Sequence, residues 1–247
     1  MSICIGTFNY EENTQNKNLE NNAFSYGPSL EIKFGKAFKI FSLLELGKRY
    51  YYFSKQPIES NFQLITTLNL ERDLNAKLWG KITLTPKQND VTETLKIIEQ
   101  NLDGINIIQS TDTGQKPLAV VKLKNEMNVV PMKSLGDGIN RIFNISLALV
   151  NSDNGYLLID EFENGLHYSV QEKLWEIIFT MSKKLNVQVF ATTHSYDCVR
   201  AFEKIVNNGF KDEGALIKLE NVNGEVKNVR FDSNELLIAS EHNIELR

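Results

Sequence analysis

A short buried strand that ends in two carboxylates constrains this 247-residue chain more than any other feature. The apolar residues Tyr156–Ile159 predict a strand inside a core, and Asp160 and Glu161 follow at its end. Ligands of open α/β sheets bind outside the carboxyl ends of the strands, so both acids are expected at a site. Asp160 suits Mg²⁺, directly or through a water, and Glu161 suits the orientation or deprotonation of an attacking water. The alternative is a strand that ends in two solvated acids.

A histidine follows a second apolar strand further along the chain. Residues 187–192 predict this strand, and His194 and Ser195 come shortly after it. If the two strands are neighbours, His194 lies at the same sheet edge as Asp160 and Glu161. A neutral imidazole there can donate to the γ-phosphate of a nucleotide and respond to its loss. The alternative is a surface or capping histidine, with Ser195 as the N-cap of the next helix.

A glycine-rich turn precedes both strands and opens a helix. It contains Ser134, Gly136, Asp137 and Gly138. The free N–H groups and the dipole at a helix N-terminus attract anions, and glycines let the backbone approach a phosphate closely. The turn therefore predicts an anion site. The alternative is an ordinary helix start with Ser134 or Asp137 as the N-cap.

From residue 133 onward, helices and strands alternate, which is typical of an α/β domain with a parallel sheet. The two strands are continuous apolar runs, as expected when helices cover both faces of a sheet. A hairpin with Asn223 and Gly224 at its tip follows. The expected elements are helices over 137–150, 168–185, 196–206 and 233–241, strands over 156–160 and 187–192, and a hairpin over 215–231.

The preceding sequence predicts two further regions. Residues 1–67 are expected to be the remnant of a β-rich N-terminal or insert region that includes an Asn/Glu-rich surface loop, and residues 68–132 a helical and β-meander lobe. Residues 133–247 then form the α/β core. The expected elements are strands over 30–34, 37–46 and 49–53, helices over 68–79 and 91–102, and strands over 104–110, 117–124 and 127–132.

The composition excludes several classes of protein. The formal net charge is −4, so no global basic field supplies non-specific nucleic-acid affinity, and any such contact must be local. Cys4 and Cys198 lie far apart without a CxxC or Cys/His cluster, which argues against a disulfide framework or a zinc site. The start has no signal-peptide pattern and no run reaches the length of a membrane span, so a cytoplasmic protein is expected.

Three motifs in this order resemble the signature motif, the Walker B motif with D-loop, and the switch-histidine loop of ABC-type ATPases. They are SLGDGINR, YLLIDEFENGLH and VFATTHS. From about Leu70 to its end, the chain resembles the small bacterial ABC-like AAA ATPases related to the overcoming-lysogenization-defect family. The resemblance implies the C-terminal part of an ABC-ATPase-like P-loop NTPase fold, with residues 133–247 as the ATPase core.

The resemblance also implies ATP and Mg²⁺ as ligands and a role for individual residues. Asp160 would be the magnesium-side aspartate, Glu161 the catalytic glutamate and His194 the switch residue. The residues facing the γ-phosphate of nucleotide on the partner subunit would be Ser134, Gly136, Asp137 and Gly138. The D-loop at the dimer interface would consist of Asn164, Gly165, Leu166 and His167.

Two positions depart from the family pattern. The transporter-type signature has serine directly before its glycine, where this chain has Leu135. Which hydroxyl of the signature, if any, reaches phosphate is therefore left open. His167 occupies the place of the usual D-loop aspartate.

A phosphate loop of the form GxxxxGK[ST] is absent from the 247 residues. In the family that loop cradles the phosphates with its backbone and neutralises them with its lysine. The nearest segment, Gly35–Ala37, lacks the upstream glycine and the following Ser or Thr. The chain is therefore expected to be a truncated or split product that binds ATP poorly by itself.

Two functions fit these expectations. The first is ATP binding and hydrolysis in a nucleotide-sandwich dimer, either a homodimer or a complex with a half that carries the phosphate loop. By resemblance it would act in DNA-related or phage-defence processes, with an effector protein as a further partner and no membrane. The second is a non-catalytic truncated or split half that serves as an interaction module. A short reading frame directly upstream that encodes GxxxxGK[ST], together with the ATP affinity of the chain alone, is expected to separate the two.

Overall fold

The computed structural model describes residues 2–7, 28–34, 37–42, 61–67, 70–108, 116–211, 213–222 and 225–241. The chain divides into two compact units, Met1–Glu59 and Ser60–Arg247. In the first unit, β1 (Ser2–Thr7), β2 (Pro28–Phe34) and β3 (Ala37–Ser42) form an antiparallel sheet in the order β1-β2-β3. The strands expected over 30–34 and at the start of 37–46 are present. The strand expected over 49–53 and the Asn/Glu-rich tract lie outside the described residues.

The second unit is built on a parallel sheet of three short strands. They are β4 (Phe62–Ile65), β8 (Tyr156–Ile159) and β9 (Gln188–Ala191), in the order β4-β8-β9. The register aligns Ile65 with Ile159 and Ile159 with Ala191, so all three strands end at one edge. The residues that follow each of the three strands therefore lie at the same edge of the sheet.

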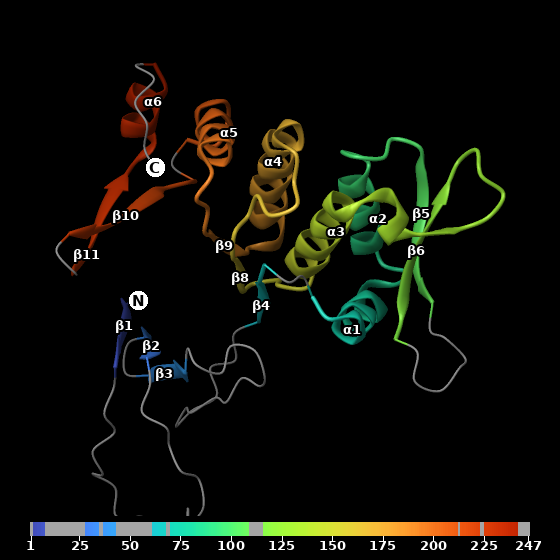
Figure 1. The fold of residues 1–247 in the computed structure, drawn as a ribbon, viewed down its shortest axis with the longest axis horizontal. Coiled ribbons are helices and arrows are strands. Elements are labelled where there is room, and N and C mark those ends of the chain that lie inside the picture. The colour runs from blue at the N-terminus through green and yellow to red at the C-terminus, as the bar shows by residue number, and fades with distance from the viewer. Residues whose placement is uncertain are drawn as a thin grey trace, which may run out of the picture. The chain divides into compact units, whose positions relative to one another are not determined.

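Three helices lie in a row beside this sheet (Figure 1): α3 (Asp137–Val150), α4 (Tyr168–Leu185) and α5 (Tyr196–Asn207). The helix α3 packs against α2 and α4 and against the strands β4 and β8. Such an enclosed helix must be apolar on nearly every side, and the side chains from Arg141 to Val150 are all buried. The helices expected over 137–150, 168–185 and 196–206 are confirmed, α5 extending one residue further.

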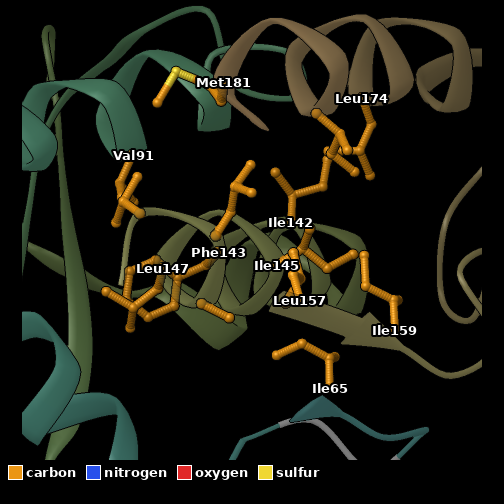
Figure 2. Close-up of a cluster of buried hydrophobic side chains, with 14 of the residues drawn as sticks. Ile65, Val91, Ile142, Phe143, Ile145, Leu147, Leu157, Ile159, Leu174 and Met181 are labelled. Atoms are coloured by element: carbon orange, nitrogen blue, oxygen red, sulfur yellow. The ribbon is translucent and has the colours of Figure 1, made fainter. Parts of the chain in front are cut away.

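The main core lies between the sheet and these helices. Figure 2 shows Ile142 and Ile145 of α3 close to Leu157 of β8, with Leu174 of α4 beside them. Side chains alternate along a strand, so Leu158 points to the opposite face, where it is half-buried. Its neighbour in the register, Phe190, is 37% exposed. The expectation that β8 and β9 are buried on both faces is therefore wrong, because the side chains opposite the helices keep access to solvent.

A helical and antiparallel part precedes α3. It contains α1 (Arg72–Ile82), α2 (Pro86–Leu95), β5 (Leu102–Ile108), β6 (Leu118–Leu123), β7 (Val130–Pro131) and a short 3-10 helix, η2 (Met132–Leu135). The meander β5-β6-β7 is confirmed. The helix expected over 91–102 is wrong at both ends. Pro86, whose fixed φ suits the first helical position, starts α2 earlier, and Leu102 instead pairs with Leu123 in the meander.

The chain continues after α5 with the hairpin β10 (Leu216–Val222) and β11 (Glu225–Phe231), and with α6 (Ser233–Glu241). Val222 pairs with Glu225, as the expected two-residue tip requires, although the tip residues themselves are outside the described part. No helix in the described ranges is long and apolar enough to cross a membrane. The division into 1–67, 68–132 and 133–247 stays a prediction.

Candidate functional site

The turn after β8 carries the two predicted acids. The N–H of Asp160 donates to the carbonyl of Ile65 at 2.8 Å, and the N–H of Phe162 donates to the carbonyl of Thr192 at 2.9 Å. These bonds extend the sheet pairing past the strand ends on both sides. Glu161 adopts φ +48°, a left-handed conformation that is uncommon for residues other than glycine. The turn is therefore held in a strained shape that leaves the Glu161 side chain 44% exposed.

Phe162 anchors this turn in the core. Its ring is fully buried and stacks on Trp175 of α4, with centroids 4.0 Å apart and an angle of 2° between the ring planes. A stacked aromatic pair of this kind contributes about 0.5–1.5 kcal/mol beyond the apolar area that it buries. The turn that carries Asp160 and Glu161 is therefore held firmly against the core by Phe162.

Thr192, directly after β9, joins the two strand ends. Its hydroxyl donates to Asp160 Oδ1 at 2.7 Å and accepts from the N–H of Glu161 at 2.9 Å. The carboxylate of Asp160 is therefore oriented by the residue that follows the neighbouring strand.

His194 lies at the same edge, as the sequence predicted. Its Nδ1 is 4.0 Å from Glu161 Oε1 and 3.2 Å from Glu163 Oε1, and its backbone N–H donates to Glu163 Oε1 at 3.1 Å. Glu163 is 12% exposed, whereas the imidazole is 77% exposed. Glu163 is thus the carboxylate that orients His194, and the rest of the ring faces solvent. Ser195 is the N-cap of α5, as expected, and accepts from the N–H of Cys198.

Arg141 of α3 closes the site from the core side. The side chain is 1% exposed and donates to the carbonyls of Thr66, Asp160 and Glu161 at 2.6, 2.7 and 2.7 Å. Burial lowers the pKa of the guanidinium, and the carboxylates of Asp160, Glu163 and Glu161 oppose that effect. An arginine stays protonated under these conditions, so a cation lies beneath the acids.

The glycine-rich turn lies at the start of α3. Gly136 is the N-cap of α3 and has φ +100°. Because glycine has no side chain, Gly136 cannot cap the N–H groups of the first turn of the helix. The alternative of Ser134 or Asp137 as the N-cap is therefore wrong. The hydroxyl of Ser134 instead donates to the carbonyl of Pro131 at 2.6 Å, and Asp137 is an exposed residue of the first turn.

The segment predicted to be the D-loop packs against this turn. A Cβ at Gly138 would lie 3.2 Å from the carbonyl oxygen of Gly165, so the absence of a side chain permits the close approach. Gly165 has φ +72°, and Asn164 Nδ2 donates to the carbonyl of Thr67 at 2.9 Å. Leu166 packs partly buried against the core.

His167 caps α4. Its Nδ1 accepts from the N–H of Ser169 at 3.3 Å and lies 2.8 Å from the hydroxyl of the same residue. His167 therefore has a local structural role at the start of α4.

The donor set at the sheet edge suits Mg²⁺. This ion takes one or two protein carboxylates and completes its shell with substrate oxygens and water. Asp160 and Glu161 offer such carboxylates. Within the described ranges, no group of three or more His, Cys, Asp or Glu side chains could hold a metal ion alone. Asp160 and Glu161 therefore have the oxygen-donor chemistry that Mg²⁺ prefers.

Three residues of this site were missed in the sequence. Thr192 is the first polar residue after an apolar strand, the same signal that identified Asp160. Glu163 is the third carboxylate of a short acidic run. Arg141 is the one cation of an otherwise apolar or neutral helix segment, 138–150, and a cation inside such a segment indicates a buried polar partner.

Comparisons with known proteins identify the family of this chain. A family model described as an AAA ATPase domain matches residues 7–199. An ATP/GTP phosphatase of Helicobacter pylori is 30% identical over 122 residues, which are 48% of this chain and 32% of that protein. An uncharacterized protein of Methanocaldococcus jannaschii is 38% identical over 65 residues, which are 26% of this chain and 57% of that protein. The chain thus spans less than two thirds of the length of either curated relative.

A solved structure supports the fold assignment. The crystal structure of an SMC head bound to the C-winged helix domain of ScpA is similar with a TM-score of 0.51 and 12% identity, over 85% of this chain and 70% of that chain. The chain therefore has the α/β fold of ABC-like P-loop ATPase heads, with a parallel sheet and an antiparallel meander. Since the family model covers more than half of its residues, the chain belongs to the AAA ATPase domain family.

Proposed function

We propose that this chain supplies the hydrolytic residues of an ATPase that binds nucleotide between two subunits. The observation that supports this most is the meeting of Asp160, Glu161 and His194 at one sheet edge, with 4.0 Å between His194 Nδ1 and Glu161 Oε1. Membership of an ATPase family supports nucleotide as the ligand. Hydrolysis, Mg²⁺ and the dimer are parts of the proposal.

In this proposal each acid has one task. Glu161 orients the attacking water and accepts its proton, for which a half-exposed carboxylate on a rigid turn is suited. Asp160, oriented by Thr192, binds Mg²⁺, which when bound neutralises phosphate charge. His194 donates from its solvent-facing ring to the γ-phosphate, while Glu163 fixes its orientation.

The glycine-rich turn contributes to the nucleotide of the partner subunit. The N–H groups of Asp137 and Gly138, at the positive end of the α3 dipole, are the proposed phosphate donors. Ser134 contributes less, because its hydroxyl proton is already donated to Pro131. The segment of Asn164, Gly165, Leu166 and His167 lies beside this turn and is the proposed dimer contact. By resemblance, the process that we propose for the ATPase is a DNA-related or phage-defence one, in the cytoplasm.

The absence of GxxxxGK[ST] favours a second candidate, a non-catalytic interaction module. Such a chain would dock on a half that carries the phosphate loop, and would bind ATP poorly alone.

The two candidates are separated by turnover measurements on Glu161→Gln. ATP hydrolysis and ATP binding are measured for the 247-residue chain, alone and mixed with a polypeptide that carries the strand, GxxxxGK[ST] loop and helix. If the chain is hydrolytic, Glu161→Gln lowers turnover by roughly 100-fold or more while ATP binding persists, because only proton transfer is lost. Glu172→Gln, an exposed change on α4, is the matched control. Turnover that is absent in every wild-type sample supports the interaction module.

A further inference from the structure

We infer that Arg141 is a positioning residue that ties the first turn of α3 to the turn bearing Asp160 and Glu161. As far as nucleotide is concerned, this inference rests on the proposed function. Arg141 then links the first turn of α3, which is proposed to bind the phosphate of the partner's nucleotide, to Glu161, which is proposed to activate water. Where the inference concerns the shape of the turn, it rests on the contacts of Arg141 alone.

The guanidinium gathers three carbonyls from the ends of two neighbouring strands. One belongs to Thr66, after β4, and two belong to Asp160 and Glu161, after β8. The carbonyl of Glu161 also accepts from the N–H of Asn164 at 3.0 Å. Because a planar fork donates in fixed directions, Arg141 sets the peptide planes on both sides of Glu161.

The other end of this connection is α3 itself. Arg141 lies one helical turn beyond Asp137, so the two residues share one face of a rigid element. Gly138, in the same turn, lies against the carbonyl of Gly165. A displacement of the first turn of α3 along the helix axis therefore carries the guanidinium with it, and pulls on the carbonyls of Asp160 and Glu161.

Stability alone does not account for a cation at this place. A buried charge must lose its water, and a well-packed apolar residue of similar volume is often no less stable. Arg141 also leaves its Nε without a hydrogen-bond partner among the described residues. The remaining side chains of α3 from Ile142 to Val150 carry no charge. The guanidinium is thus costly, and its bonds are concentrated on the turn that holds the acids.

Hydrogen exchange of the full chain tests the positional role without nucleotide. In Arg141→Met, amides of 160–166 are expected to exchange roughly tenfold faster or more, since a hydrogen bond to a charged group contributes about that factor or more. Amides inside 170–185 keep their protection. Arg141→Lys retains the charge but loses the fork, and falls between wild type and Arg141→Met. Arg200→Met, the same change at an exposed position of α5, leaves 160–166 unaltered.

Two results overturn the inference. One is unchanged exchange of 160–166 in folded Arg141→Met. The other is a uniform rise over the whole of 60–241, which makes Arg141 a general core residue. If Arg141→Met does not fold, the comparison between Arg141→Lys and wild type decides by the same criteria.

Turnover tests the link to nucleotide. In whichever sample hydrolyses ATP, Arg141→Lys is expected to lower kcat roughly 10- to 100-fold while KM for ATP changes less than about threefold, as for a misplaced catalytic group. Equal kcat in wild type and Arg141→Lys refutes the inference even if Glu161→Gln is inactive. Absence of hydrolysis in every sample instead refutes the proposed function, and the exchange measurement then decides the role of Arg141.

Discussion

The hydroxyl of Thr192 lies 2.7 Å from Asp160 Oδ1 and donates a hydrogen bond to it. The oxygen of the Thr192 hydroxyl also accepts a hydrogen bond from the N–H of Glu161. One hydroxyl after β9 therefore fixes both the side chain of one acid and the backbone of the next. The parallel register, which aligns Ile159 with Ala191, makes this contact available.

Replacement of Thr192 by valine is expected to lower the free energy of unfolding by about 1–3 kcal/mol, because the shape is kept while two hydrogen bonds of about 0.5–1.5 kcal/mol each are lost. Urea unfolding followed by circular dichroism measures this difference. Thr180→Val, which removes a hydroxyl bonded only to a carbonyl of its own helix, is the matched control and should change stability less. Equal midpoints for the two variants would show that the Thr192 contacts do not stabilise the turn.

The location of the site could be predicted because it depends on where strands end. An apolar run followed by polar residues identifies such an end, and the carboxyl ends of parallel strands meet at one edge. The strand ends therefore predict that Asp160, Glu161 and His194 lie together, and the structure has them together. They do not select the partner of His194. Glu161 and Glu163 both follow the same strand end, and only the structure shows that Glu163 lies closer to His194 Nδ1, at 3.2 Å against 4.0 Å for Glu161.

The role of Arg141 was beyond the same reasoning, for a different physical cause. A sequence shows that a helix carries a cation, but the three carbonyls that it reaches come from residues far away along the chain. The ends of α2 were missed because a proline at the first helical position and a strand pairing at Leu102 outweigh the apolar spacing. Long-range contacts decide the partners of Arg141 and the strand at Leu102, whereas the start at Pro86 is a local signal that apolar spacing does not include.

The thiol of Cys198 makes stability depend on pH in the alkaline range. Burial raises its pKa from 9.0 to about 12. The unfolded chain releases this proton first, so the stabilisation is complete below pH 9 and is lost as pH rises towards 12. Between pH 8 and pH 10, wild type is expected to lose about 1.4 kcal/mol more than Cys198→Ala, because one pH unit above the unfolded pKa corresponds to that difference.

Urea unfolding of both proteins at the two pH values measures this loss. Lysines and tyrosines titrate in both proteins, and their contributions cancel in the difference. An identical loss of stability in wild type and Cys198→Ala would mean that the thiol ionises as readily in the folded chain as in the unfolded one.

The contact between Gly138 and Gly165 gives a prediction that uses two glycines of the same chain. Alanine inside a helix is usually about 0.5–1 kcal/mol more stable than glycine. At Gly80, in α1, an added Cβ meets nothing within 4 Å, so Gly80→Ala should show this gain. At Gly138 the added Cβ would lie 3.2 Å from the carbonyl oxygen of Gly165 and 3.4 Å from Ile98 Cδ1, so the gain should disappear.

Unfolding free energies of the two variants are therefore expected to differ by about 0.5 kcal/mol or more, with Gly138→Ala the less stable. The backbone of Gly165 must move by a few tenths of an ångström to accept the methyl group. Faster hydrogen exchange at 163–166 in Gly138→Ala, and not in Gly80→Ala, would locate the strain in that turn. If both variants gain equally, the turn after Glu163 yields without cost, and a displacement of the first turn of α3 could not be transmitted through it.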